Sequence, residues 1–503
     1  MADFDFNGIP YIYTDEECSA ETVIDIYKNT KAEANKIFKH LEKLTKIYKG
    51  DQEEYIPDSN RTANEKNVTN YTRVFLDTVV SILFNKPVSY VSRVKKQNYL
   101  RDVDTIVAYM NDEGESGLNI STGTDMLVNG LGFQYVLQQK NNDPTPYSPF
   151  TLGRFDMTNT YAVHSTSVGN KIEVIFHIIK YKDKDNKQIE KIIAYDDNNI
   201  YTIIKKDLDL DYEFEKIIIL NPVNKKYEYF DYITHDMPNN PVQLFNGDMY
   251  RLSSVQDLWG LQKSLNNAIS SYNNDMLLKI NQLLTVLGIT LDDDEIEKMK
   301  NQNILNSPDV NAKIQFIASQ IDNRAIDYIN DTIDRMNVIS GAPSQGGSRA
   351  ETGVASQTEN GHTIASFNSN RREQQFYIPK RKQLANIIAI LRRTGKLKSD
   401  ITERDIEIKF DRNRLDSLTE TVNNLKTLIG TGVKPIDALK VSPIFEDNGS
   451  VAEGIEETIK ETRQHELLLK QSSSNTEINN NQQGDSNGTE KWIWKNTLSK
   501  LSK

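Results

Sequence analysis

The feature that most constrains the fold is a block of strand-like sequence enclosed between helical segments. Between residues 133 and 232, short runs of β-branched and aromatic residues recur, a pattern typical of β-strands. Turn residues such as those at 183–186 and the pair Asn221-Pro222 separate the runs. This spacing predicts an antiparallel meander. The runs are 133–137, 161–164, 172–181, 192–195, 200–204, 217–220 and 227–232.

Two amphipathic segments precede this block. Residues 21–49 place apolar side chains close to helical spacing with lysines between them, which predicts a helix. A second apolar segment, 71–84, ends before Pro87, which cannot continue a helix. Residues 1–245 therefore read as one α+β domain.

After Asn246-Gly247 the helical pattern returns. Apolar residues from Leu252 to Met276 fall near one face and predict a long helix. A compact mixed segment, 280–321, includes a predicted strand at 313–318, and 325–338 predicts a shorter returning helix. A helix going out, a small module and a helix coming back predict a stalk with a tip.

The rest of the chain alternates polar and helical stretches. Residues 341–361 are rich in Gly, Ser, Thr and Gln and predict a mobile loop. Residues 362–394 predict one long helix, bent at Pro379 because proline lacks the N–H and clashes with the preceding turn. A strand is predicted at 405–410, helices at 417–429 and 451–470, and disorder at 471–490.

Composition excludes several classes of protein. The 503 residues include 60 Lys and Arg against 71 Asp and Glu, a net charge of -11, which argues against tight nonspecific nucleic-acid binding by the whole surface. The single cysteine, Cys18, excludes an intrachain disulfide. No apolar run approaches the roughly 18 residues that a membrane span requires, and the N-terminus does not read as a signal peptide.

The sequence contains no complete motif for catalysis, metal binding or cofactor binding. The pair Gly395-Lys396 lacks the upstream glycine and the hydroxyl of a phosphate-binding loop. Residues 341–346 have the wrong spacing for a nucleophile elbow. The six histidines have no cysteine or carboxylate at ligand spacing. We expect a protein that is not an enzyme and holds no cofactor or metal.

Two charged clusters each have more than one interpretation. The acidic run Asp292, Asp293, Asp294 and Glu295 suits a divalent cation and hence nuclease chemistry, but acids also stabilise a helix start, which we favour. The stretch 371–398 holds nine Lys or Arg against Glu373 alone. This basic stripe is either a solvated face, a partner for acids on a neighbouring subunit, or a contact for DNA phosphates.

Four groups of short motifs lie along the chain. They are Asn67-Val68-Thr69-Asn70-Tyr71 leading to Lys86-Pro87-Val88, Thr160-Tyr161-Ala162-Val163, Asn239-Asn240-Pro241-Val242 leading into 254–275, and Ile339-Ser340-Gly341-Ala342-Pro343 with Thr352-Gly353-Val354-Ala355. The order of these motifs resembles that of the portal proteins of tailed bacteriophages, of the type found in phages of Gram-positive bacteria. The resemblance covers about residues 60–430, and the collinear order of the motifs is its strong part. Residues 276–325 match least.

The resemblance implies a portal fold with named parts. It implies an α+β wing, a helical stem, a small mixed clip, a long kinked helix and a helical crown. The implied ranges are wing 1–245, stem helix 246–275, clip 276–324, second stem helix 325–340, tunnel loop 341–361, kinked helix and wing return strand 362–410, crown 411–470 and disordered tail 471–503.

The resemblance also implies a function. The family forms a ring, usually of about twelve copies, at one capsid vertex, through which double-stranded DNA is packaged and ejected. Implied partners are terminase and the head-completion or adaptor proteins, with the major capsid and scaffolding proteins, and Asp292 to Glu295 would lie in the clip that docks partners. The ring would assemble in the host cytoplasm and remain in the virion. The alternative is a DNA-binding scaffold or adaptor without a ring.

The implied DNA-channel contacts lie in the tunnel loop and are Ser344, Gln345, Ser348, Arg349 and Asn360. On the kinked helix, the candidates for contact with DNA or a neighbouring subunit are Arg371, Arg372, Lys380, Arg381 and Lys382. A channel through which DNA moves must not bind the DNA tightly. A loop with one cation therefore suits a sliding polymer, because its phosphate contacts are weak.

Overall fold

A computed structural model describes most of the chain, and its contacts divide it into two units. Unit 1 comprises Met1–Ser348 and Gln357–Asn413, and unit 2 comprises Arg349–Ser356 and Arg414–Lys503. The described residues are 4–59, 64–84, 86–139, 148–184, 186–206, 210–220, 227–280, 284–287, 313–316, 323–342, 362–410, 418–435, 438–439, 455–461 and 464.

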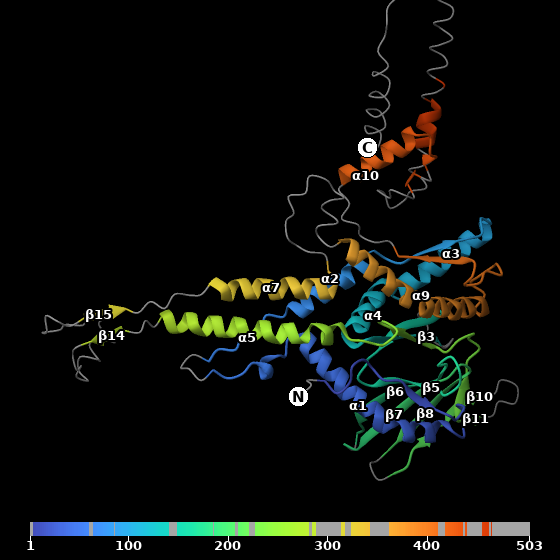
Figure 1. Cartoon of the computed structure of the whole chain (residues 1–503). Coiled ribbons are helices and arrows are strands. Elements are labelled where there is room, and N and C mark those ends of the chain that lie inside the picture. The colour runs from blue at the N-terminus through green and yellow to red at the C-terminus, as the bar shows by residue number, and fades with distance from the viewer. Residues whose placement is uncertain are drawn as a thin grey trace, which may run out of the picture. The chain divides into compact units, whose positions relative to one another are not determined.

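The largest sheet of unit 1 is an antiparallel meander with one parallel strand at its edge (Figure 1). Its strands run in the order β1-β5-β6-β7-β8-β12, and β9 also pairs with β8. Consecutive strands from β5 to β8 pair antiparallel, which confirms the predicted meander for this part. The bounds are β1 Ile12–Thr14, β5 Thr160–Ser165, β6 Ile172–Lys182, β7 Gln188–Tyr195, β8 Asn199–Lys205, β9 Glu213–Phe214 and β12 Tyr232–Thr234.

The predicted single meander is wrong at both ends. Its first run forms β3 (Leu131–Gln138), which lies in a separate sheet between β4 (Phe150–Phe155) and β13 (Val242–Asn246). Near the other end, β10 (Ile217–Leu220) and β11 (Tyr227–Phe230) form a hairpin of their own. Strand period alone cannot assign a run to a sheet, because the pattern reports burial and not the pairing partner.

Helix α1 (Val23–Lys49) packs on the large sheet through aromatic side chains. Tyr27 contacts Phe176 and Phe38 contacts Tyr161, with ring centroids 5.3 and 5.9 Å apart. The helix ends at Gly50, whose φ of 96° is the left-handed conformation common after a helix C-terminus. The predicted range 21–49 is confirmed to within two residues at its start.

Helices α2, α3 and α4 cover another part of unit 1. Helix α2 (Tyr71–Phe84) was predicted from its apolar spacing. Helices α3 (Gln97–Asp112) and α4 (Glu115–Asn129) were not predicted, although Val103, Ile106 and Met110 of α3 have helical spacing and are buried. In α4, Gly123 permits close packing, because a Cβ there would lie 2.3 Å from the ring of Phe84 in α2.

Helix α9 (His362–Arg393) joins the two hydrophobic clusters of unit 1. Phe376 belongs to the cluster that includes α1 and the large sheet, whereas Leu384, Ile387 and Leu391 belong to the cluster that includes α3 and β16. Pro379 lies inside the helix between these two groups, as the sequence predicts, and Figure 1 shows the two halves of the ribbon running in different directions. Strand β16 (Ile406–Lys409) then pairs antiparallel with β2 (Ser89–Ser92).

Unit 2 has a small core in its described residues. Leu425 of helix α10 (Leu418–Gly430) clusters with Ala438 and Leu439, and Ile455 packs against them. Residues 455–461 are helical. Within the described part of the whole chain, no helix is both long and apolar enough to traverse a lipid bilayer.

Candidate functional site

Two long helices form an extended pair in unit 1, as the sequence predicts. Helix α5 (Ser254–Ile280) and helix α7 (Asn323–Ser340) lie side by side in Figure 1. Beyond their far ends, β14 (Leu284–Leu287) pairs antiparallel with β15 (Lys313–Phe316). The chain thus leaves the body along α5 and returns along α7.

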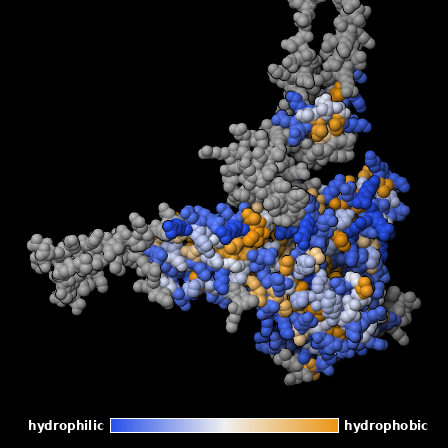
Figure 2. Space-filling model, viewed as in Figure 1, coloured by the Kyte–Doolittle hydropathy of each residue, from blue (hydrophilic) through white to orange (hydrophobic). Residues whose placement is uncertain are grey.

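The helix pair presents apolar side chains on its surface. On α7, Val338 and Ile339 are 68% and 52% exposed, and Tyr328 is 50% exposed. Figure 2 shows apolar residues gathered where α7 returns to the body, on a face that is otherwise mainly hydrophilic. Exposed apolar clusters of this kind mark surfaces that contact other proteins.

A ladder of polar side chains fixes α5 to the extended segment 64–70 and to Thr72 in the first turn of α2. We call it the α5 ladder, and it consists of Gln262, Asn266, Ser270 and Asn274. These residues are four apart and lie on one helix face. Asn274 Oδ1 accepts from the backbone N–H of Glu65 (2.8 Å), Ser270 Oγ from Asn67 (2.9 Å), Asn266 Oδ1 from Thr69 (3.1 Å) and Gln262 Oε1 from Thr72 (3.0 Å).

The geometry of the α5 ladder follows from two backbone periods. Four helical residues rise about 6 Å. Two extended residues span about 6.6 Å, so Glu65, Asn67 and Thr69 meet successive rungs, whereas the fourth rung meets Thr72 in α2. Asn274 Nδ2 and Gln262 Nε2 also donate to the carbonyls of Glu65 and Thr69. The polar side chains of α5 therefore supply the hydrogen-bond partners that a neighbouring strand would supply to this segment in a β-sheet.

The basic stripe on α9 divides into buried and exposed cations. Lys380 is 1% exposed, and its Nζ donates to Glu115 Oε1 (2.8 Å) and Asn119 Oδ1 (3.0 Å) of α4. Arg371 and Lys382 are exposed, whereas Arg372 and Arg381 are half-buried. At the end of the helix, Arg393 pairs with Asp236 at 3.1 Å.

The buried carboxylate of Glu115 collects three donors. Besides Lys380, Oε1 accepts from the hydroxyl of Tyr90 (2.7 Å) and from Nδ2 of Asn119 (2.6 Å). Burial alone would raise the pKa of Glu115, but Lys380 and these hydrogen bonds outweigh it and lower the pKa below the ordinary value. Burial also lowers the pKa of Lys380, which Glu115 opposes. The pair ties α9 to α4, one residue after Pro379.

Arg372 lies close to acids at the start of α5. Its Nη1 is buried and has no hydrogen-bond partner among the described residues. Burial, with the neighbouring Arg371, lowers its pKa to about 10, although Asp248 and Asp257 oppose the shift. Burial also raises the pKa of Asp257, which Asp248 reinforces and Arg372 opposes.

Comparison with known proteins shows the family to which the chain belongs. The family model described as phage portal protein, SPP1 Gp6-like, matches residues 27–465. The chain belongs to this family. A solved structure described as "Virion of native gene transfer agent (GTA) particle" is similar, with a TM-score of 0.36 and 12% identity over 78% of this chain and 89% of that chain. None of the curated proteins compared with the chain matches it.

Membership of this family confirms the resemblance to portal proteins that the sequence motifs indicated. The chain is a phage portal protein with a mixed α and β fold, a capsid-associated component of the virion that functions as an oligomeric assembly. The portal family is a structural one and not a family of enzymes. Within the described residues, no group of three or more His, Cys, Asp or Glu side chains could hold a metal ion.

One predicted contact of this portal protein is wrong. Lys380 was expected to face DNA or a neighbouring subunit, but its side chain is buried and paired with Glu115 of the same chain. A count of charges along the sequence cannot distinguish a buried cation from an exposed one. The tunnel-loop residues Ser344, Gln345, Ser348, Arg349 and Asn360 and the acidic run 292–295 lie outside the described residues.

Proposed function

We propose that this portal protein forms a ring of about twelve copies at one capsid vertex. The ring is the channel for packaging and ejecting double-stranded DNA, and the docking platform for terminase and head-completion proteins. The observation that carries the proposal is the family match over residues 27–465. The pair α5 and α7, with exposed apolar residues on α7, supplies a surface for contact between copies.

The parts of the ring follow the order of the chain. We assign 1–245 and the return 362–410 to the wing, 246–275 and 325–340 to the stem, 276–324 to the clip, 341–361 to the tunnel loop, 411–470 to the crown and 471–503 to a tail. The chain itself has no catalytic role in this scheme, and the ATPase of the motor is a separate protein. Assembly takes place in the host cytoplasm together with scaffolding and major capsid proteins.

Arg371, an exposed cation of the basic stripe, contacts a neighbouring copy in this proposal. Each chain has a net charge of -11, so copies repel one another at long range. Arg371 is exposed and has no ion pair within the described part of the chain. A cation on α9 facing an acidic neighbour offsets part of the repulsion. The buried position of Lys380 and the pairing of Arg393 weaken the alternative of a continuous DNA-binding stripe.

Solution mass with imaging tests the ring. Light scattering on the purified protein, with negative-stain images of the same fraction, should give an annular particle of about a dozen 57.5 kDa chains with a central hole. A monomer with salt-dependent duplex affinity would contradict the ring and favour an adaptor without a ring. The ring needs no duplex binding by the monomer.

Deletion of the tunnel loop tests the channel. Residues 341–361 contain Arg349 as their one Lys or Arg against Glu351 and Glu359, which suits weak, exchangeable phosphate contacts. Removal of residues 344–359 should leave rings intact by light scattering and block DNA packaging in a reconstituted assay. Packaging at the wild-type rate would contradict the assignment of this loop.

A further inference from the structure

A polar cavity of about 520 Å³ lies in unit 1 beside the proline of α9. Pro379 and Lys382 of α9 line it together with residues of strand β13 and of the turn between β5 and β6. Its deeper lining includes Arg251, His164 and Gln243, which are 3%, 2% and 5% exposed. Of its lining residues, Lys382 alone was also named as an expected contact to DNA or a neighbouring subunit.

Arg251 brings a buried positive charge to the cavity. Its Nε donates to Asn246 Oδ1 and its Nη2 to His164 Nε2, both at 3.0 Å. His164 Nδ1 lies 2.9 Å from the carbonyl of Asn170, so Nδ1 carries the proton and Nε2 accepts. The guanidinium also stacks on the ring of Tyr11, 3.7 Å from its centroid.

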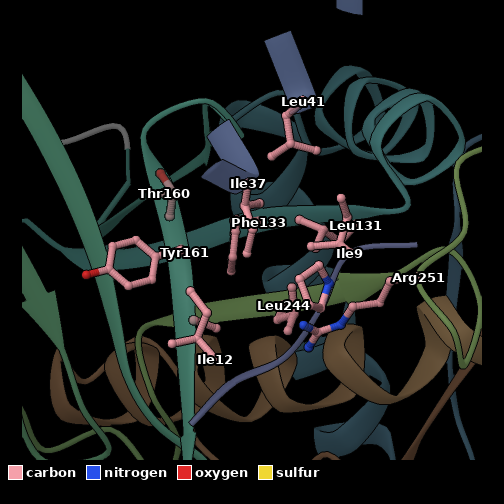
Figure 3. A pocket seen from close by; sticks show the side chains of 12 residues that line it. Ile9, Ile12, Ile37, Leu41, Leu131, Phe133, Thr160, Tyr161, Leu244 and Arg251 are labelled. Carbon is pink, nitrogen blue, oxygen red and sulfur yellow. The ribbon is translucent and has the colours of Figure 1, made fainter. Parts of the chain in front are cut away.

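Every one of these partners is electrically neutral. Among the described residues, no carboxylate pairs with Arg251, and burial lowers its pKa to about 10. On its other side Arg251 adjoins a small apolar pocket, where Figure 3 shows it beside Leu244 and Ile9. A buried charge without a counter-charge is costly, because neither water nor an opposite charge replaces its hydration.

The rim of the cavity adds further positive charge. Lys171 pairs with Asp197 at 3.1 Å, and both side chains are partly exposed. Lys382 is exposed on α9. Of the charged residues that line the cavity, three are cations (Arg251, Lys171 and Lys382) and one is an acid (Asp197), so two positive charges are left over.

We propose that this cavity binds a phosphate monoester or inorganic phosphate. Such a group carries between one and two negative charges near neutral pH, which matches the surplus of two cations. It also accepts several hydrogen bonds, for which the unused guanidinium N–H groups of Arg251 supply donors. A DNA phosphodiester carries one negative charge and belongs to a duplex too wide for a cavity of this volume. The ligand is therefore a small molecule and not the translocating DNA.

Equilibrium dialysis of the full-length protein against radiolabelled inorganic phosphate, in chloride buffer of constant ionic strength, tests the site. We expect saturable binding of one phosphate per chain. Arg251→Gln and Lys382→Glu should each weaken it by roughly tenfold or more. The matched control is Lys396→Glu, which makes the same charge change at an exposed lysine outside the cavity and should alter affinity less than about twofold.

Competition in the same assay identifies the source of the phosphate group. If an unlabelled mononucleotide displaces the radiolabelled phosphate at a lower concentration than unlabelled inorganic phosphate does, the ligand is a phosphomonoester. If it does not, the ligand is inorganic phosphate. Lys382→Glu decides the outcome even if Arg251→Gln does not fold, because Lys382 is exposed. Wild-type binding no tighter than that of Lys382→Glu would overturn the proposal. Displacement by a short DNA duplex as effective as by phosphate would overturn it as well.

Discussion

Three glycines allow backbone segments to approach closely around the start of α5. A Cβ on Gly8 would lie 2.5 Å from the carbonyl oxygen of Tyr250, and one on Gly130 would lie 2.3 Å from that of Arg251. A Cβ on Gly247 would lie 2.4 Å from the carbonyl oxygen of Met126. Arg251 itself has a φ of 55°, in the left-handed region. The turn that begins α5 is therefore held by backbone contacts that no other residue type permits.

Gly130→Ala tests this close approach, with Gly114→Ala as its control. Both glycines have a left-handed φ, 79° and 71°, but a Cβ on Gly114 would meet no atom within 4 Å. We expect Gly114→Ala to cost about 1 kcal/mol from backbone strain alone. Gly130→Ala should cost at least about 2 kcal/mol more, because the backbone of Arg251 must also move. Equal shifts in thermal unfolding midpoint would show that the close contact does not matter.

The buried His164 predicts a loss of stability in mild acid. Burial, with Arg251 nearby, lowers its pKa to about 4 from the ordinary 6.5. The unfolded chain then binds a proton that the folded chain does not, so stability is full above about pH 6.5 and falls as the pH drops toward 4. Between pH 7 and pH 5 this group alone should account for about 2 kcal/mol. His164→Gln should reduce the loss by that amount in urea unfolding measured at both pH values, and an unchanged loss would contradict it.

Single residues were the level at which the sequence was least informative. The basic stripe was recognised from its composition. Composition does not show that Lys380 is buried and Arg371 is exposed, because burial depends on tertiary packing. Arg251 was not recognised, because its partners Asn246, His164 and Tyr11 are spread over the chain and form no local motif. The tunnel-loop residues remain predictions from the family resemblance.

At the level of elements, the pair Lys380 and Glu115 should hold α9 against α4. Glu115→Gln leaves a buried ammonium without its counter-charge and should cost about 3 to 5 kcal/mol. Lys380→Met should cost a similar amount, and the double variant much less than the sum, since neither charge then remains. The control is Asp331→Asn in the exposed pair with Arg335, which should cost less than about 0.5 kcal/mol. Additive costs in a double-mutant cycle of unfolding would contradict the coupling.

The α5 ladder gives a second prediction for an element. Asn266 is 1% exposed, and besides accepting from Thr69 its Nδ2 donates to Gln52 Oε1 at 2.6 Å. Asn266→Ala should cost about 1 to 3 kcal/mol, because these polar groups lose their partners. Ser264→Ala is the control, since its hydroxyl bonds only within the exposed face of the same helix. Hydrogen exchange at the Thr69 amide should accelerate in Asn266→Ala alone, and unchanged protection would argue against the ladder.

Local spacing predicted several elements, including the short strands β15 and β16, but it did not predict helices α3 and α4. The apolar spacing located α1, α2, α5, α7 and α9 correctly, because each buries one face over many turns. Helix α4 was missed, because Gly117, Gly123 and several Ser and Thr residues give it low intrinsic helix propensity, and tertiary packing overrides that propensity. The pairing of β2 with β16 joins residues far apart in sequence, which no local pattern encodes.

At the scale of the whole molecule, assembly must overcome the charge of the chain. With -11 per copy, long-range repulsion opposes a ring, so short-range contacts must supply the attraction. Exposed apolar residues of α7 and exposed cations of α9 are the candidates for these contacts. Salt screens both repulsion and attraction between exposed charges. An apolar contact alone would therefore make the ring more stable at high salt, whereas a decisive ion pair would make it less stable.

Arg371→Glu separates a subunit contact from a DNA contact. If Arg371 faces an acid of the neighbouring copy, the reversal places like charges together, and rings should dissociate at a protein concentration roughly tenfold higher than wild-type rings do. Lys396→Glu changes the net charge equally at an exposed lysine beyond the end of α9, so it controls for overall repulsion and should leave the ring mass unchanged. Light scattering over a dilution series measures both. Arg371→Glu rings as stable as wild type that fail to package DNA would instead place Arg371 in the channel, because the residue would then be needed by the polymer and not by the assembly.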